Sequence, residues 1–220
     1  MADIIFTPEI LIAWVDVETT SLDYDSLHVL EVGLIITQGL HLEELYKESF
    51  LTIPPGHTQE SIVEELDDFI TTMHTKSGLI DDYLQADISS TISDNANIYH
   101  YSVLDEHLRQ IIKDTCGDEK VVMAGNSITF DRTVLSMHFP LFLDSIHYHS
   151  MDLTSVSMFV STLTPHRPQF STQATHRSLD DLERAQEQFI EWRKSAIQHL
   201  TGKKDEKTLD AVNHSVTRYR

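Results

Sequence analysis

The sequence predicts an α/β fold in which a mixed central sheet, flanked by helices, begins with a three-strand antiparallel meander. Three apolar runs with short connections fill the first quarter of the chain, and Pro54-Pro55-Gly56 ends the third. After this stop the apolar residues recur at helical spacing, and two short apolar runs between the helices are typical of buried strands. Strands that alternate with helices in this way indicate an α/β domain.

The individual elements follow from the period of the apolar residues in each segment. Runs rich in Val, Ile and Leu favour strands, whereas apolar residues three and four apart favour helices. The predicted strands are residues 11–17, 28–37, 46–53, 121–124 and 147–153. The predicted helices are residues 61–69, 79–87, 103–116, 130–142 with an interruption at Phe139-Pro140, 154–163 and 178–200, with a polar loop at 165–175.

Length and charge bound the organisation of the chain. Its 220 residues predict a single domain over 1–200, followed by a polar C-terminal extension at 201–220. A net charge of −19 argues against a groove for long nucleic acid, which needs Lys and Arg to neutralise phosphates. The one cysteine, Cys116, excludes an internal disulfide, and no apolar run is long enough to span a membrane. We therefore expect a cytoplasmic protein with no membrane partner.

Three acidic residues lie next to apolar strand candidates. Asp16 and Glu18 are two apart in the first strand, so their carboxylates should share a face and repel each other unless a divalent cation lies between them. The alternative is that the strand ends at Val15 and that both acids are solvated loop residues. Asp131 follows the strand at 121–124, and the dipole of the next helix would by itself favour an acid there.

His176 and Asp181 flank the start of the last predicted helix. The string Ser178-Leu179-Asp180-Asp181 matches a capping box, which explains Asp181 without any chemistry. A capping box does not explain His176. A neutral imidazole in this loop is a plausible general base near pH 7, and an Asp one turn into the helix could approach the same point.

The order of these residues resembles the DEDD exonucleases of the histidine subtype, which have a ribonuclease-H-like fold. Longer strings resemble one family within that group, the oligoribonucleases. These strings are DVETTSL from Asp16, MHTKSGL from Met73, AGNSITFD from Ala124, His147-Tyr148 with Met151-Asp152, and HRSLDDLERA from His176. The resemblance covers about residues 10 to 200 and leaves the tail outside.

This resemblance implies a 3′-to-5′ exoribonuclease that degrades very short oligoribonucleotides, chiefly dinucleotides, to 5′-mononucleotides. By position, His176 would be the general base, and the metal-binding carboxylates would be Asp16, Glu18, Asp131 and Asp181. Two divalent cations, Mg²⁺ or Mn²⁺, would be the cofactors, since hard cations prefer oxygen ligands. The resemblance also implies a homodimer.

Substrate contacts are implied in the same way. Leu22 and Phe69 take the places of a leucine and a tryptophan that wedge against the bases, although a core aromatic is the alternative for Phe69. His74 matches a histidine near the catalytic centre, and a helix-end histidine is its alternative. Ser127, Thr154 and Ser155 match residues near the terminal 5′ phosphate, and Tyr148 matches a tyrosine donated across the dimer.

Two departures from the family pattern bear on substrate choice. His149 stands where the family has an arginine that caps the 5′ phosphate, and Ser21 replaces a glycine in the turn before Leu22. Arg is a permanent, bidentate phosphate partner, whereas His is mostly neutral at neutral pH. We expect a weaker preference for 5′-phosphorylated dinucleotides, or one that strengthens below about pH 6.5.

The sequence leaves other functions open. A less length-selective exonuclease of the same superfamily would act on longer RNA or DNA. A catalytically inert module would bind nucleic acid or a partner protein, and a structural acidic protein would use its carboxylates only to cap helices. Metal binding distinguishes the last of these, because clustered carboxylates gain stability from Mn²⁺ and scattered caps do not.

Overall fold

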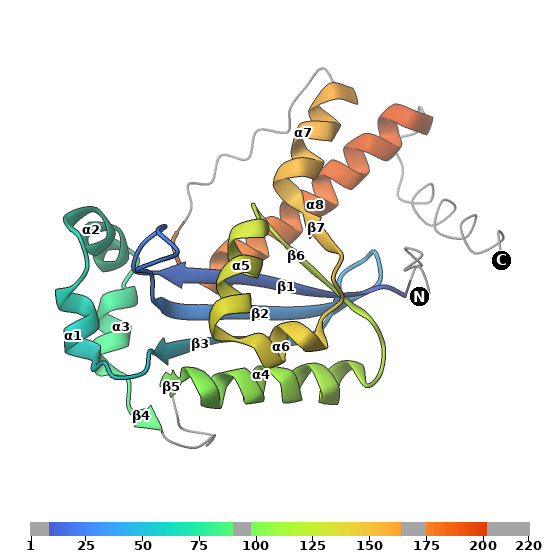
Figure 1. Ribbon diagram of the computed structural model, residues 1–220. Helices are drawn as coiled ribbons and strands as arrows, with labels where there is room; N and C mark the ends of the chain where they lie inside the picture. Colours follow the sequence, from blue (N-terminus) through green and yellow to red (C-terminus); the bar gives the residue numbers. More distant parts are fainter. Residues whose placement is uncertain (1–8, 90–97, 164–174, 202–220) are drawn as a thin grey trace.

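Figure 1 shows a computed structural model, which describes residues 9–89, 98–163 and 175–201. These residues form one seven-stranded sheet in the order β4-β5-β3-β2-β1-β6-β7. The strands are β1 (Leu11–Thr19), β2 (Val29–Gln38), β3 (Glu43–Ile53), β4 (Ile88–Ser89), β5 (Ile98–His100), β6 (Val121–Gly125) and β7 (Ser150–Asp152). The helices are α1 (Gln59–Glu64), α2 (Asp68–Lys76), α3 (Leu79–Gln85), α4 (Tyr101–Cys116), α5 (Thr129–His138), α6 (Pro140–Ser145), α7 (Leu153–Leu163) and α8 (Ser178–Thr201).

The sheet is mixed, and its strand directions confirm the predicted meander. β2 pairs antiparallel with β1 and with β3, whereas β6 pairs parallel with β1 and with β7. On the other side β5 lies parallel to β3 and to β4. The three-strand meander, extended by parallel strands next to β1 and flanked by helices, is the ribonuclease-H-like arrangement that the sequence predicted.

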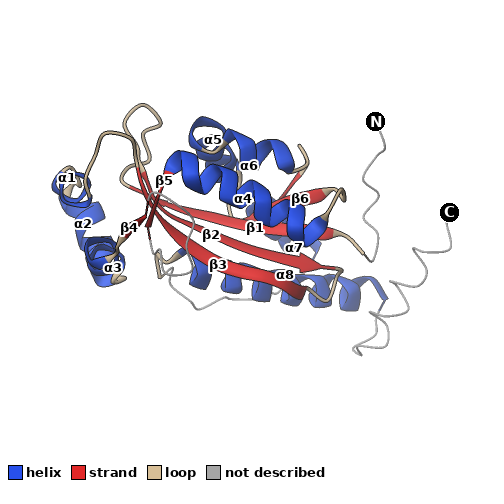
Figure 2. Cartoon of the chain, turned by 90° about the horizontal axis from the view of Figure 1, so that it is seen from below, coloured by secondary structure: helices blue, strands red, loops and turns tan. Residues whose placement is uncertain are grey.

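Alternation along β1 divides the core between the two faces of the sheet. Leu11, Ala13, Val15 and Val17 belong to the apolar cluster that includes residues of α4, α5 and α6. The even positions before residue 16 belong instead to the cluster with α7 and α8. Figure 2 shows these two groups of helices on opposite faces. Asp16 and Glu18 continue the even series, so their side chains lie on the α8 face.

The boundaries differ from the predicted ones where side chains cap helices. The single helix predicted at 61–69 is wrong, because Thr58 caps α1 and Asp67 caps α2 with a side-chain oxygen 2.8 Å from the backbone nitrogen of Ile70. The interruption at Phe139-Pro140 is confirmed and separates α5 from α6. Asp105 on α4 accepts hydrogen bonds from the first turn of α6, which docks that short helix.

Short strands were the least predictable elements. The strand predicted at 147–153 is only three residues long, and residues 147–149 precede it as irregular chain. β4 and β5 have two and three residues, too few to show a period. The polar loop predicted at 165–175 and the tail at 201–220 lie almost entirely outside the described residues. Among the helices described, none is long and apolar enough to cross a membrane.

Candidate active site

Three carboxylates converge where the end of β1 meets the beginning of α8. One oxygen from each of Asp16, Glu18 and Asp181 lies within 4.8 Å of the others. Strand alternation brings the first two together, and α8 packs across the same face with its first turn beside them. β1 continues to Thr19, so the alternative in which the strand ends at Val15 and the acids are solvated is wrong.

Asp131 approaches the cluster from the other side of β1. It lies in the first turn of α5, is 4% exposed, and its Oδ1 accepts a hydrogen bond of 3.0 Å from the backbone nitrogen of Val17. Val17 stands between the two strand acids. The carboxylate therefore reaches β1 itself, which a helix-dipole role alone does not require.

Burial makes the charges of these acids costly. Burial raises the pKa of Asp16 well above its ordinary value, and the charges of Asp131, Glu18 and Glu31 raise it further. Burial, then Glu31 and Asp131, raise the pKa of Glu18 to about 8. Desolvation also raises the pKa of Asp131 to about 7. Such a set of desolvated oxygen donors fits a divalent cation, whose charge would offset the repulsion.

His176 is held beside the cluster by the carboxylate of Asp181. The backbone nitrogens of Thr175 and His176 donate to its two oxygens at 3.3 and 3.1 Å, so Asp181 fixes the loop as a cap would. Asp181 also forms an ion pair with Arg184. His176 has a φ of 58°, in the left-handed region that residues with a Cβ seldom adopt. The predicted capping box is wrong: Ser178 lies inside α8, its Oγ has no hydrogen-bond partner among the described residues, and its backbone nitrogen donates to Glu31 instead of Asp181.

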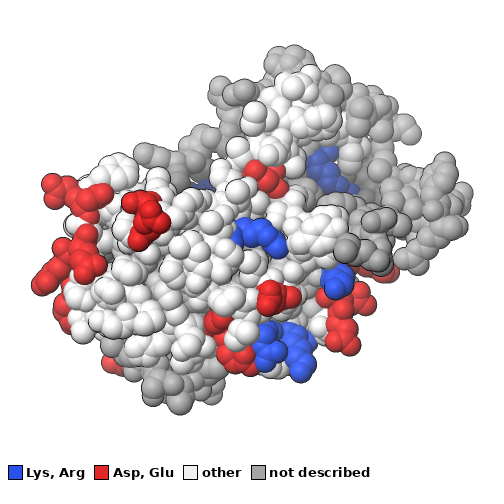
Figure 3. Space-filling view, viewed as in Figure 1, with Lys and Arg blue, Asp and Glu red and all other residues white. Residues whose placement is uncertain are grey.

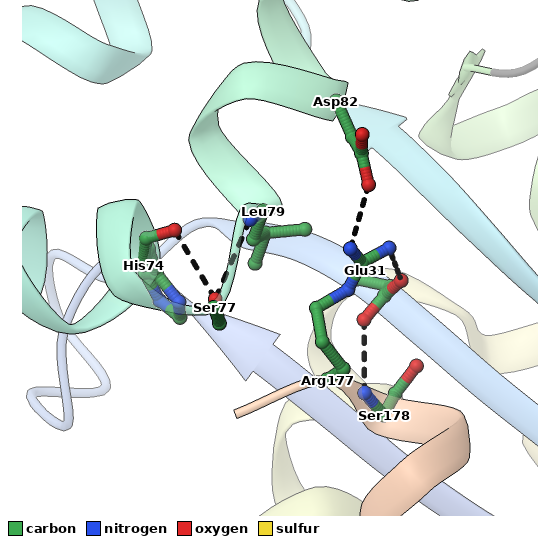
Figure 4. A network of polar contacts seen from close by, with 7 residues as sticks. All are labelled: Glu31, His74, Ser77, Leu79, Asp82, Arg177 and Ser178. Carbon is green, nitrogen blue, oxygen red and sulfur yellow. Dashed lines mark hydrogen bonds and ion pairs between the residues drawn. The ribbon is translucent and has the colours of Figure 1, made fainter. Parts of the chain in front are cut away.

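An ion-pair network around the buried Glu31 holds the same loop (Figure 4). Glu31, 1% exposed, lies opposite Glu18 on β2 and accepts hydrogen bonds from Arg177 Nη2 at 3.1 Å and from the backbone nitrogen of Ser178 at 2.9 Å. Arg177 Nη1 also donates to Asp82 on α3 at 2.6 Å. Sequence reasoning missed this network. An acid inside the apolar run HVLEVGLIIT was the available signal.

His74 is fully buried on α2 beneath the end of β1. Its Nε2 donates to the carbonyl oxygen of Thr19 at 3.2 Å, while its Nδ1 has no hydrogen-bond partner among the described residues. Burial lowers the pKa of His74, and the nearby His176 lowers it further. The structure thus places His74 next to the catalytic candidates, in the interior of the fold.

The predicted substrate residues fall into three groups. Leu22 and Phe69 are 76% and 73% exposed, so the core alternative for Phe69 is wrong. Ser127, Thr154 and Ser155 gather at the end of β6. The backbone nitrogen of Ser127 donates to Thr154 Oγ1 at 3.0 Å, and Ser155 Oγ donates to Asp152 at 3.0 Å. These polar groups line the same end of the sheet as the acids.

Tyr148 and His149 lie directly before β7, which β6 separates from β1 in the sheet. The backbone nitrogen of His147 bonds to the carbonyl oxygen of Val121, whose partner on β1 is Leu11. Leu11 and Asp16 are five positions apart on β1, about 16 Å at ~3.3 Å per residue. The backbone of His147 thus lies near the opposite end of the strands, and Ser150, directly after His149, pairs with Met123 further along β6.

Comparison with known proteins places the chain in a family. No family model matches it. It is 30% identical over 171 residues to an oligoribonuclease of Shewanella loihica, covering 77% of this chain and 86% of that protein. It is 28% identical over 175 residues to an oligoribonuclease of Corynebacterium diphtheriae, covering 78% and 76%.

Among solved structures, Escherichia coli exonuclease I in complex with a dT13 oligonucleotide matches with a TM-score of 0.48 and 12% identity. The match covers 93% of this chain and 43% of that one, so the chain spans less than half of the enzyme's length. A full-length 3′-exonuclease matches with the same TM-score. On the identity and coverage of its curated relatives, the chain belongs to the oligoribonuclease family of 3′–5′ exoribonucleases, which are phosphodiester hydrolases.

Proposed function

We propose that the chain removes 5′-mononucleotides from the 3′ end of very short oligoribonucleotides, chiefly dinucleotides. The observation that carries this proposal is the convergence of three carboxylates, the buried Glu18 and the partly buried Asp16 and Asp181, beside the loop that holds His176. Asp131 completes the set from α5 through its contact with β1. This arrangement offers both a cation site and a general base, as phosphodiester hydrolysis requires.

The roles of the side chains follow from their placement. Two divalent cations, Mg²⁺ or Mn²⁺, would supply positive charge to the scissile phosphate, and their ligands would be Asp16, Glu18, Asp131 and Asp181. His176 would orient the attacking water and accept its proton, while its backbone stays fixed by Asp181. The buried Glu31 would hold the loop through Arg177 and Ser178.

The exposed apolar side chains support a preference for short substrates. Leu22 and Phe69 project from two segments at the same end of the sheet as the acids, and each could stack on one base. Figure 3 shows the face that carries α4, α5 and α6, where the described Lys and Arg side chains form no continuous band. The acids lie on the opposite, α8 face, and for that face the support is the net charge of −19: a long strand would gain little from so few Lys and Arg side chains, whereas a dinucleotide needs only the metal site and two stacking contacts.

The same proposal includes a binding site for the 5′ phosphate of the substrate and a homodimer that completes this site. Ser127, Thr154 and Ser155 offer hydroxyl groups for a 5′ phosphate, with Tyr148 and His149 contributed by a second copy of the chain in a homodimer. Support for the second copy comes from His147, whose backbone nitrogen bonds to Val121 at the start of β6, away from the acids, in its own chain. We further propose residues 1–200 as one exonuclease domain, with the buried, free Cys116 suited to the cytoplasm.

The proposal is tested with 5′-labelled RNAs of two to ten nucleotides in the presence of Mn²⁺. We expect rapid loss of the dinucleotide and slow trimming of longer RNAs. Asp131→Asn should show no hydrolysis, whereas Lys194→Met, which removes a surface charge at the far end of α8, should be unaffected. Similar rates at every length would contradict the preference for dinucleotides, and equal activity of Asp131→Asn would contradict the assigned site.

A further inference from the structure

His28, His57 and Glu65 form a second cluster of metal-ligand side chains, which the proposed reaction does not use. One ligand atom from each lies within 4.8 Å of the others, and the two imidazole centroids are 4.6 Å apart. His28 ends the loop between β1 and β2, His57 lies in the turn between β3 and α1, and Glu65 follows α1 as its C-cap. Three separate backbone segments thus meet here, at the end of the sheet that carries α1 and α2 (Figure 1).

The hydrogen bond of His57 leaves the correct nitrogen free for a metal. Its Nδ1 lies 3.1 Å from the carbonyl oxygen of Pro55, and a carbonyl can only accept, so Nδ1 carries the proton. The lone pair is then on Nε2, which lies 3.9 Å from Glu65 Oε1. Metal-bound histidines commonly donate their other ring nitrogen to a carbonyl in this way.

The backbone around the cluster is fixed, while the ligands stay accessible. The backbone nitrogen of His28 bonds to Thr20 Oγ1 at 2.8 Å, and the backbone nitrogen of Thr20 bonds to the His28 carbonyl at 2.9 Å. Thr58 caps α1 directly after His57. The side chains of His57 and Glu65 are 27% and 56% exposed, so an ion could enter from solvent.

We propose that His28, His57 and Glu65 bind a divalent transition-metal ion of the Zn²⁺ class, with water as the remaining ligand. Two imidazoles and a carboxylate are a ligand set that suits Zn²⁺ and is poor for Mg²⁺. Zn²⁺ at ~2.0–2.2 Å from each ligand needs donor atoms about 3.4 Å apart. His57 Nε2 and Glu65 Oε1, 3.9 Å apart, lie near this spacing, and side-chain rotation would bring the ligand atom of His28, within 4.8 Å of theirs, into place. This site is chemically distinct from the all-oxygen site at Asp16.

The ion would fasten the loop that carries Leu22 to α1. This consequence rests on the proposed function, whereas metal binding itself does not. The loop ends at His28, and α1 is followed directly by α2, which carries Phe69. A tie between the two segments would limit the relative movement of the two proposed stacking side chains. We therefore expect the bound ion to lower KM for a dinucleotide with little change in kcat.

Binding is tested by calorimetric titration of Zn²⁺ into chelator-treated, full-length protein in excess Mg²⁺, which keeps the carboxylate site occupied by a hard cation. We expect one Zn²⁺ site in the wild type, lost in His57→Gln and in Glu65→Gln. Glu64→Gln, the same charge change on the exposed neighbouring residue, should keep it. Equal Zn²⁺ binding by the wild type and His57→Gln would overturn the proposal.

A second readout does not depend on any substitution. Diethyl pyrocarbonate modifies free imidazoles, and peptide mass mapping locates the modified residues. Zn²⁺ should protect His28 and His57 at least tenfold, while His149, exposed and outside the cluster, should react at an unchanged rate. Unchanged labelling of His57 with Zn²⁺ would overturn the site even if a variant failed to fold.

The consequence for the loop is measured separately. Zn²⁺ should lower KM for a dinucleotide several-fold in the wild type and leave His57→Gln unchanged. If Zn²⁺ binds at this site but KM does not move, the tie to Leu22 is wrong while the metal site stands. If neither protein hydrolyses RNA, the proposed function fails, and the titration and labelling still decide the metal site.

Discussion

Glu18 and Asp131 hold carboxylates in surroundings that disfavour their charge. The pKa of Glu18 is raised to about 8 and that of Asp131 to about 7, mainly by burial. In the unfolded chain these carboxylates have ordinary pKa values of ~4. At any pH between these values and the raised pKa values of the folded state, the folded chain therefore binds more protons than the unfolded chain. Without metal, stability should therefore fall as the pH rises from about 4 to 8, the opposite of a salt-bridged acid.

Glu18→Gln should stabilise the metal-free chain at pH 8 by on the order of 2 kcal/mol, because a neutral amide replaces a desolvated charge. At pH 5 the gain should be much smaller, since Glu18 is then protonated in the folded state. Urea unfolding of chelator-treated protein at both pH values measures this, with the exposed Glu64→Gln as control. Mn²⁺ should stabilise the wild type more than the variant. A wild type whose metal-free stability rises from pH 5 to 8 would contradict the argument.

His149 carries the clearest departure from its family, and a single substitution tests it. His149→Arg should raise the preference for 5′-phosphorylated over unphosphorylated dinucleotides at pH 8 by on the order of tenfold, because a permanently charged, bidentate partner replaces an imidazole ring. The measurement is the ratio of kcat/KM for the two substrates. An arginine-like preference of the wild type at pH 8 would show that His149 is not the cap.

The elements show which features a sequence can predict. The two-residue period in β1 correctly places Asp16 and Glu18 on one face, because alternation is a local property. That α8 covers this face, and not the opposite one, depends on the path of the chain after β7 and has no local signal. The same alternation argument, applied to β2, is needed to place Glu31 on this face. Glu31 was missed because its partner Arg177 is far away in sequence, which only the fold reveals.

Gly33 on β2 sets how closely the start of α8 can approach the sheet. A Cβ on Gly33 would lie 2.7 Å from both Cβ and Oγ of Ser178, closer than side-chain atoms tolerate. Gly33→Ala should therefore push α8 away, destabilise the fold by about 1–3 kcal/mol and lower kcat through the displaced Asp181 and His176. Adding Ser178→Gly should recover most of both losses. If the double variant is no better than Gly33→Ala, the close approach is not what positions α8.

At the scale of the whole molecule, the proposed homodimer needs a contact surface between its two subunits. His147, just before Tyr148 and His149, bonds to the start of β6, and the acid cluster lies near the carboxyl end of β1. In the proposed homodimer a second copy of the chain brings these segments together. Among the described residues, α7 exposes Met158 and Phe159 at 69% and 64%, an apolar pair on a chain otherwise rich in acids. A net charge of −19 on each subunit opposes association, so an apolar contact must overcome that repulsion.

Phe159→Glu should convert the proposed dimer to a monomer, because it places a further negative charge in the proposed contact at α7. Light scattering should give twice 25.2 kDa for the wild type and 25.2 kDa for the variant. Leu84→Glu, a matched change at a half-exposed leucine on α3, should stay dimeric. The wild-type dimer should also tighten with salt, which screens like charges. With the dimer lost, the 5′-phosphate preference created by His149→Arg should disappear, because the proposed phosphate site takes this residue from the partner. If that preference persists in a monomer, residues 147–149 act within their own chain, and the dimer is not required for the site.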